Sequence, residues 1–333
     1  MTLRRGIGAA LLALAACSAA PPANTPEPVT DAPADNAVPE VPVHEDAPGL
    51  PEPDALARLP LAEACDGILK QGGLIVCHGA TGDAFRFGEV ILTADETGAV
   101  QFGLARNAPA SVTVESGGET LVLPIAARSD PSRTVPGLDC DKVDARTPAQ
   151  KAHAADSWEK KQASFNALLE GRGALGGFAA PSAARASSPF GPERRYTGVS
   201  KTSGKPCDSL SVHQGLDFAA PPGSPVTASA AGTVTLADPD LYYEGGAVFI
   251  DHGQGLLSVF MHLSALHVSA GDEVTPGQLI AHSGDTGRSS GPHLHWGVKW
   301  RNPASTDRSG DFYLDPALLL SLPAAASGED AVP

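Results

Sequence analysis

The sequence predicts a mainly β protein with two folded parts joined by a helix. Its 333 residues exceed the roughly 100 to 200 residues of one domain, which leaves room for two domains and linkers. Glycine and proline are abundant, at 36 and 30 residues, and favour turns between short strands over long helices. The formal charge of −15 has the wrong sign for binding a phosphate backbone, so we expect no nucleic-acid partner.

Residues 1–16 have the pattern of an export signal. Arg4 and Arg5 precede an apolar run that is about half of the ~20 residues a membrane-spanning helix needs. The segment Leu14-Ala15-Ala16-Cys17 resembles the bacterial lipobox, in which the cysteine becomes the lipidated first residue. Ser18 after it favours the outer membrane in such lipoproteins. We therefore expect a bacterial envelope protein that is anchored through Cys17 and faces the periplasm; the alternative is an ordinary secretory signal with an unrelated cysteine.

Residues 17–58 are predicted to be a disordered tether. Between Ser18 and Asp54 there are 10 prolines and 8 acidic residues but no lysine or arginine, so this segment can neither bury a core nor compact by charge pairing. Residues 323–333 are predicted to be a disordered tail.

Four cysteines remain beyond the signal, namely Cys65, Cys77, Cys140 and Cys207. An even number in an oxidising compartment indicates two disulfides, for which three pairings exist. We favour Cys65 with Cys77, which bracket one short apolar segment, and Cys140 with Cys207. No C-x-x-C spacing occurs, which argues against a zinc-thiolate site.

Residues 59–140 are predicted to form a small β-sandwich. Short β-like runs separated by glycine-containing turns cover residues 73–76, 88–93, 99–105, 111–115 and 119–126. Gly117-Gly118 can close a hairpin between the last two runs. We expect His78 to be a packed or surface histidine rather than a metal ligand.

Residues 141–187 are predicted to be a helix followed by a flexible linker. Thr147 is a suitable N-cap and Pro148 suits the first helical position; the helical pattern runs to Leu169 and stops at Gly171. Residues 173–187 are rich in glycine, alanine and serine, which predicts a joint that allows motion between domains.

Residues 188–322 contain the histidines that make chemical sense together. His213 and Asp217 lie four apart in chain that reads as extended, so both can point to one face of a strand. His293 and His295 share a face in the predicted strand 292–300. A surface pair is the alternative interpretation of the first motif alone. Combined, His213, Asp217 and His295 supply three nitrogen and oxygen ligands, which suits a catalytic zinc site with its fourth position left for water.

A catalytic zinc site also needs a proton acceptor, and the sequence has no H-E-x-x-H motif to supply one. His262 follows the apolar run 256–261, which is predicted to be a buried strand after the tight turn 252–255. His262 and His293 can take a proton or stabilise an oxyanion, since imidazole titrates near neutrality. The alternative for His262 alone is a structural histidine, and the sequence does not assign which of the two is the base.

Six segments carry a resemblance to a known family. They are Ser188-Pro-Phe-Gly191, His213-Gln-Gly-Leu-Asp217, Val259-Phe-Met-His262-Leu263, Val274-Thr-Pro-Gly-Gln278, Gly284-Asp-Thr-Gly287 and Gly291-Pro-His-Leu-His295-Trp296. In this order they resemble the lysostaphin-type, or LytM-like, zinc metallopeptidases. The resemblance implies an antiparallel β groove, zinc on His213, Asp217 and His295, catalytic imidazoles at His262 and His293, and the peptide cross-links of peptidoglycan as substrate.

The sequence departs from the family pattern in two places. Phe260-Met261 stands where many members have a tyrosine and a small residue before the catalytic histidine. His282 has no counterpart, and we expect it, with His252 and His267, not to be a ligand.

Two functions fit these residues. The favoured one is a metalloendopeptidase that hydrolyses stem-peptide cross-links, and the envelope context favours a diaminopimelate cross-link between D-residues. The alternative is a non-catalytic LytM-like lipoprotein that binds the wall and activates amidases. Because none of the five chemical positions is missing, the sequence favours the enzyme. No feature indicates an oligomeric state.

Overall fold

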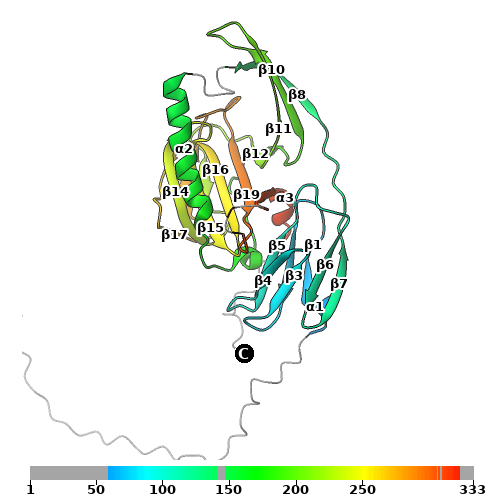
Figure 1. The fold of residues 1–333 in the computed structure, drawn as a ribbon. Coiled ribbons are helices and arrows are strands. Elements are labelled where there is room, and N and C mark those ends of the chain that lie inside the picture. Colours follow the sequence, from blue (N-terminus) through cyan, green and yellow to red (C-terminus); the bar gives the residue numbers. More distant parts are fainter. Residues whose placement is uncertain (1–58, 141–146, 306, 308–309, 323–333) are drawn as a thin grey trace, which may run out of the picture. The chain divides into compact units, whose positions relative to one another are not determined.

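The computed structural model describes residues 59–140, 147–305, 307 and 310–322, and arranges them mainly as antiparallel β-sheets (Figure 1). The mainly β fold class is therefore confirmed. Within the described residues, none of the helices has the length and apolar character needed to cross a bilayer. The predicted signal 1–16, the lipidation site Cys17, the tether 17–58 and the tail 323–333 lie outside the described residues.

The small amino-terminal part consists of two sheets that face each other across apolar side chains. The three-stranded sheet has the order β1-β2-β5 and contains β1 (Cys65–Ile68), β2 (Leu74–His78) and β5 (Ala99–Gly103). The four-stranded sheet has the order β4-β3-β6-β7 and contains β3 (Ala84–Phe87), β4 (Val90–Thr93), β6 (Ser111–Ser116) and β7 (Glu119–Pro124), preceded in the chain by α1 (Leu61–Ala64). In β6, Val112 and Val114 are buried while the residues between and beside them are exposed. This alternation, with a turn at Gly117-Gly118, is the pattern that the sequence predicted.

The large sheet has ten strands. Its main path is β17-β14-β15-β16-β19-β12-β9, and β13, β18 and β20 pair beside it. The bounds are β9 (Ala186–Ser188), β12 (Leu216–Phe218), β13 (Pro225–Thr227), β14 (Gly232–Leu241), β15 (Gly245–Gly253), β16 (Leu256–Leu266), β17 (Glu273–Val274), β18 (Leu279–Ser283), β19 (Leu294–Trp300) and β20 (Phe312–Leu314). Every residue of β15 is buried, so both faces of the sheet are covered there.

Helix α2 (Pro148–Asn166) covers one face of this sheet beside β14 (Figure 1). The helix starts where the sequence predicted: Thr147 accepts a hydrogen bond from the backbone of Gln150, and the Gln150 side chain accepts one in return from the Thr147 backbone, which is a capping box. Phe165 stacks on Phe249 with ring centroids 5.6 Å apart. The helix ends three residues before the predicted Leu169, as the chain turns to extended backbone at Ala167.

The segment 173–187, predicted to be a flexible joint, is instead packed against the large sheet. It begins with a short 3-10 helix, η3 (Gly173–Gly176), and ends in β9. Phe178 is buried against the ring of His252, and the Ala179 amide donates to the Ser229 carbonyl. The small residues of this segment therefore allow close packing against the sheet. Amino-acid composition alone does not distinguish such a packed segment from a flexible one.

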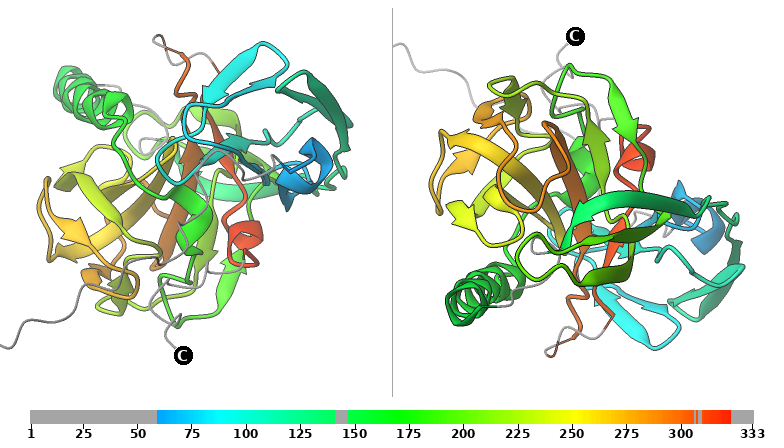
Figure 2. Two further views of the ribbon diagram at one scale, coloured as in Figure 1. Left: turned by 90° about the horizontal axis from the view of Figure 1, so that it is seen from below. Right: turned by 90° about the horizontal axis from the view of Figure 1, so that it is seen from above.

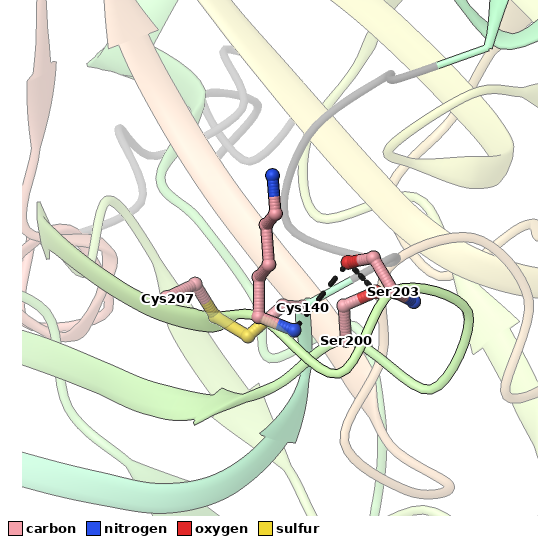
Figure 3. Close-up of a disulfide and its surroundings, with 5 residues drawn as sticks. Cys140, Ser200, Ser203 and Cys207 are labelled. Carbon is pink, nitrogen blue, oxygen red and sulfur yellow. Dashed lines mark hydrogen bonds between the residues drawn. A yellow bond between two sulfur atoms is a disulfide. The ribbon is translucent and has the colours of Figure 1, made fainter.

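A third sheet has the order β11-β10-β8. It contains β8 (Arg133–Asp139), β10 (Glu193–Val199) and β11 (Pro206–Val212), so the end of the predicted 59–140 domain pairs with the carboxyl-terminal part. The disulfide Cys140–Cys207 joins the end of β8 to β11, near the turn that holds Ser200 and Ser203 (Figure 3). Together with Cys65–Cys77, it confirms the favoured pairing.

The small part and the large sheet share one continuous core. The Trp300 indole donates to the Gln101 carbonyl, and its ring meets the edge of Phe102 at a centroid distance of 5.2 Å. The carboxyl-terminal helix α3 (Pro316–Leu319) follows Asp315, which pairs with Arg128; Figure 2 shows α3, in red, beside the blue and cyan strands. The described residues between 59 and 322 accordingly belong to one compact unit.

Gln101 is a fully buried polar residue where the small part meets the large sheet, and we expect it to stabilise this contact. Its side-chain oxygen accepts from the Ala174 amide at 2.7 Å, and its amide nitrogen donates to the Arg172 carbonyl at 2.8 Å. Gln101→Ala leaves both backbone groups without a partner and should lower the free energy of unfolding by about 2–4 kcal/mol in a urea titration. The exposed Thr113→Ala on β6 is the control, expected to cost less than about 1 kcal/mol. Equal losses in the two variants would contradict the structural role of Gln101.

Candidate metal centre

Three of the predicted site residues form a buried cluster whose ligand atoms lie within 4.8 Å of one another. Asp217 Oδ1 lies 3.0 Å from His213 Nε2 and 2.9 Å from His295 Nδ1, and the two nitrogens are 3.2 Å apart. Strands β12 and β19 pair so that Asp217 stands directly opposite His295. The three residues are therefore placed to bind a metal ion.

His213 and Asp217 do not lie on the one continuous strand that the sequence predicted. His213 follows the end of β11, and β12 starts only at Leu216, so the backbone leaves the β conformation between the two residues. A β-carbon at Gly215 would lie 2.5 Å from His295 Nε2. The convergence thus depends on a strand break and a glycine that leaves room for a ligand ring, not on a shared strand face.

A hydrogen bond fixes how the His213 ring faces the centre, and burial acts on the His295 ring. His213 Nδ1 donates to the Pro189 carbonyl at 2.6 Å, which leaves Nε2 with its lone pair toward the cluster. Burial lowers the pKa of His295, which keeps its ring neutral. Burial alone would raise the pKa of Asp217, but its close contacts with His213 and His295 hold that pKa well below its usual range. The donor set is therefore two imidazoles and one carboxylate.

His262 lies beside the cluster on a β-bulge of β16. Its backbone has a φ of 64°, in the left-handed region that a residue other than glycine seldom adopts. The register between β15 and β16 shifts at this point, and the bulge re-aims the side chain. His262 Nδ1 donates to the Thr286 carbonyl at 2.9 Å, so Nε2 is a free acceptor, and burial lowers the pKa of this ring to about 3. Strained backbone of this kind clusters at functional sites.

His293 completes the group. It precedes β19, and its Nδ1 donates to the Gly291 carbonyl at 2.7 Å. Its Nε2 lies 3.8 Å from Asp217 Oδ1, and its ring centroid is 4.7 Å from that of His262. All five predicted site residues therefore meet at one place.

The histidines that the sequence predicted not to be ligands lie elsewhere. His252 is a core residue that bonds to the Ala231 carbonyl and to Ser258, and His267 pairs with His282 at 2.8 Å on the surface. None of them belongs to the cluster, and His78, at the end of β2, does not either.

The five residues line a groove of about 1220 Å³. Two of its other walls come from parts of the chain where sequence reasoning found no chemistry: α2, with Trp158 and Lys161, and β10, with Arg194. Lys161 pairs with Glu244 at 2.5 Å, and the Glu244 carbonyl accepts the backbone N–H of His262. Arg194 Nη2 donates to Asp217 Oδ2 at 3.1 Å. Trp158 and Lys161 lie far from the motifs in sequence, and Arg194, three residues after the segment 188–191, belongs to none of them, so no spacing signal marks these residues.

A His-Asp-His cluster with two imidazoles beside it, in a groove over an antiparallel sheet, is the arrangement that the resemblance to the lysostaphin-type peptidases implied. Residues 211–307 match peptidase family M23, so this chain contains an M23 peptidase domain.

Two similar proteins agree with this assignment, and one solved structure shares the fold. An uncharacterized metalloprotease of Haemophilus influenzae is 43% identical over 116 residues, which are 34% of this chain and 22% of that protein. The peptidoglycan DD-endopeptidase ShyA of Vibrio cholerae is 40% identical over 112 residues, which are 34% of this chain and 24% of that protein. This chain thus spans about a quarter or less of these relatives' length. A crystal structure of a candidate M23 peptidase from Pseudomonas aeruginosa shares the fold, with a TM-score of 0.50 and 24% identity over 77% of this chain and 96% of that one.

We expect the cluster to need glycine at position 215 in order to bind a metal ion. Gly215→Ala places a methyl group against the His295 ring and the Trp296 carbonyl, so we expect metal binding at least about 10-fold weaker, as when a ligand loses its support. Elemental analysis after dialysis against a fixed free-metal concentration measures the effect. Gly176→Ala is the control, because no atom lies within 4 Å of its added β-carbon. Full metal content in the Gly215 variant would show that the ring does not need this space.

Proposed function

We propose that this chain is a zinc-dependent endopeptidase that hydrolyses peptide cross-links of bacterial peptidoglycan. The observation that carries the proposal is the convergence of three ligand atoms within 4.8 Å with two imidazoles that turn an unprotonated Nε2 toward the same groove. The M23 domain and its endopeptidase relative support the reaction class.

The cluster fits zinc by its donor chemistry and its spacing. Zinc takes nitrogen and oxygen ligands at about 2.0–2.2 Å, which at tetrahedral angles places them about 3.3 Å apart. The observed separations between donor atoms are 3.0, 2.9 and 3.2 Å. A set with two imidazoles suits zinc better than calcium or magnesium, which prefer oxygen ligands. His213, Asp217 and His295 would hold the ion.

When bound, zinc polarises the scissile carbonyl and lowers the pKa of a neighbouring water. The water oxygen forms the new bond to the carbonyl carbon, and the carbon–nitrogen bond of the cross-link breaks. His262 and His293 both donate Nδ1–H to backbone carbonyls, so each presents Nε2 as a proton acceptor. The imidazole that takes the water proton delivers it to the leaving amine, and the other imidazole, after taking a proton at Nε2 from bulk water, would donate a hydrogen bond to the oxyanion.

The substrate proposal comes from the relatives. ShyA is named a peptidoglycan DD-endopeptidase, which supports a cross-link between D-residues as the bond cut by this chain. The groove, at about 1220 Å³, exceeds the roughly 300–1,000 Å³ of a small-molecule pocket. That size suits a branched peptide better than a single amino acid.

Digestion of purified peptidoglycan by the full chain, followed by mass analysis of the fragments, tests the function. We expect cross-linked fragments to become monomers, a chelator to stop the reaction, and added zinc to restore it. His295→Ala should lose both the metal and the cleavage. Cleavage that survives the chelator would refute the metal dependence, and wall binding without any cleavage would support the regulatory alternative.

Measuring zinc content and turnover on the same preparations distinguishes the roles of His262 and His293 from those of the three proposed ligands. His262→Ala and His293→Ala should each keep zinc while turnover falls by about 10²-fold or more, because each removes a group that handles the proton. His282→Ala is the matched control, since that ring pairs with His267 outside the groove. Loss of zinc in His262→Ala would make this residue a ligand, and undiminished cleavage would make it structural.

We also propose that the chain is a lipoprotein anchored through Cys17 in the outer membrane and facing the periplasm. The lipobox-like segment Leu14-Ala15-Ala16-Cys17 supports this. Cys17→Ser should move the protein from the membrane fraction to the soluble fraction of the expressing cells. Unchanged fractionation would contradict the anchor.

A further inference from the structure

We propose that Arg194 is a positioning residue that holds the metal ligand Asp217 so that only one of its oxygens binds the ion. The inference rests on the proposed zinc site. Asp217 divides its two oxygens between different neighbours: Oδ1 faces His213 and His295, at 3.0 and 2.9 Å, and Oδ2 accepts from Arg194 Nη2 at 3.1 Å.

The guanidinium of Arg194 is itself fixed in place. Its Nη2 also donates to Ser188 Oγ at 2.5 Å, and its Nη1 donates to the Tyr196 hydroxyl at 3.4 Å. Ser188 pairs with Asp217 between β9 and β12, so the guanidinium bridges two neighbouring positions of the large sheet. Arg194 comes from β10, the central strand of the third sheet, and its side chain is only 16% exposed.

This contact has a consequence for coordination. A carboxylate can bind a metal ion through one oxygen or through both. With Oδ2 occupied by a charge-assisted hydrogen bond, Asp217 presents only Oδ1, which leaves a coordination position for water or substrate. Without Arg194, Oδ2 becomes a buried anionic oxygen that lacks its donor and is free to rotate toward the ion. Partners that orient ligands in this way typically affect metal affinity or activity by about 10–100-fold.

The neighbouring residue offers a matched control. Arg195 follows Arg194 on the same strand, points to the opposite side and pairs with the exposed Asp208. Its side chain is 59% exposed and does not line the groove. The two arginines are therefore adjacent in sequence and chemically alike, but only Arg194 contacts Asp217. Both lie outside residues 211–307, where the family match runs.

The test measures zinc affinity of the full chain by competition with a chromogenic chelator. We expect Arg194→Gln to bind zinc about 10–100-fold more weakly, and Arg195→Gln to bind like wild type. Arg194→Lys should fall between them, because lysine keeps the charge but loses the planar fork of donors. In cobalt-substituted protein, the absorption of the four-coordinate ion should weaken in Arg194→Gln as Asp217 becomes bidentate.

The controls keep the two proposals distinct. Unchanged zinc affinity and an unchanged cobalt spectrum in a folded Arg194→Gln protein would overturn the role of Arg194. If that variant does not melt cooperatively without metal, Ser188→Ala decides in the same assays: it frees the guanidinium but keeps both charges, so weaker binding supports the role and unchanged binding overturns it. If wild type binds no zinc, the proposed function itself fails. If zinc binding depends on His295 and not on Arg194, only this inference fails.

Discussion

The site depends on the register of one row of residues that crosses four neighbouring strands. Met261 on β16 stands opposite His295 on β19, His295 opposite Asp217 on β12, and Asp217 opposite Ser188 on β9. Because side chains alternate along a strand, a slip of one residue in any pairing would turn a ligand to the other face. The buried apolar residues that alternate with this row, such as Leu294 and Trp296, fix the register, so core packing and ligand geometry are the same constraint.

The row is supported from outside the large sheet. Lys161 of helix α2 pairs with Glu244, and the Glu244 carbonyl accepts the backbone N–H of His262 at the bulge. Arg194 of β10 donates a hydrogen bond to Asp217 in the row. Both contacts are charged and largely buried, so each is favourable only while both partners are in place. The strained φ of His262 is compatible with a stable fold because the Glu244 and Thr286 carbonyls hold the residue from two sides.

The sequence was most informative where chemistry or local rules act over short distances. The fold class, the start of α2 at its Thr147 cap, the hairpin at Gly117-Gly118 and the meeting of the five site residues followed from caps, turns, alternation and family motifs. The prediction that Gly173 to Ser187 is a flexible joint was wrong, because glycine and alanine suit both mobile and closely packed chain. The contact between Arg194 and Asp217 joins residues 23 apart through two sheets, and a local pattern carries no information on such pairing. The bulge at His262 was missed since its cause lies in the facing strand.

Because the core is shared, the part of the chain that contains the five site residues is not expected to fold on its own. Trp300 is 1% exposed, and it is covered from the small β part by Phe102 and Gln101. Residues 188–322 cut out alone would carry that indole, with Phe312 next to it, as an uncovered apolar surface at one end of the sheet. Such a fragment would be prone to self-association. Exchange of catalytic parts between chains of this architecture is therefore expected to succeed only when the covering sheet is transferred with them.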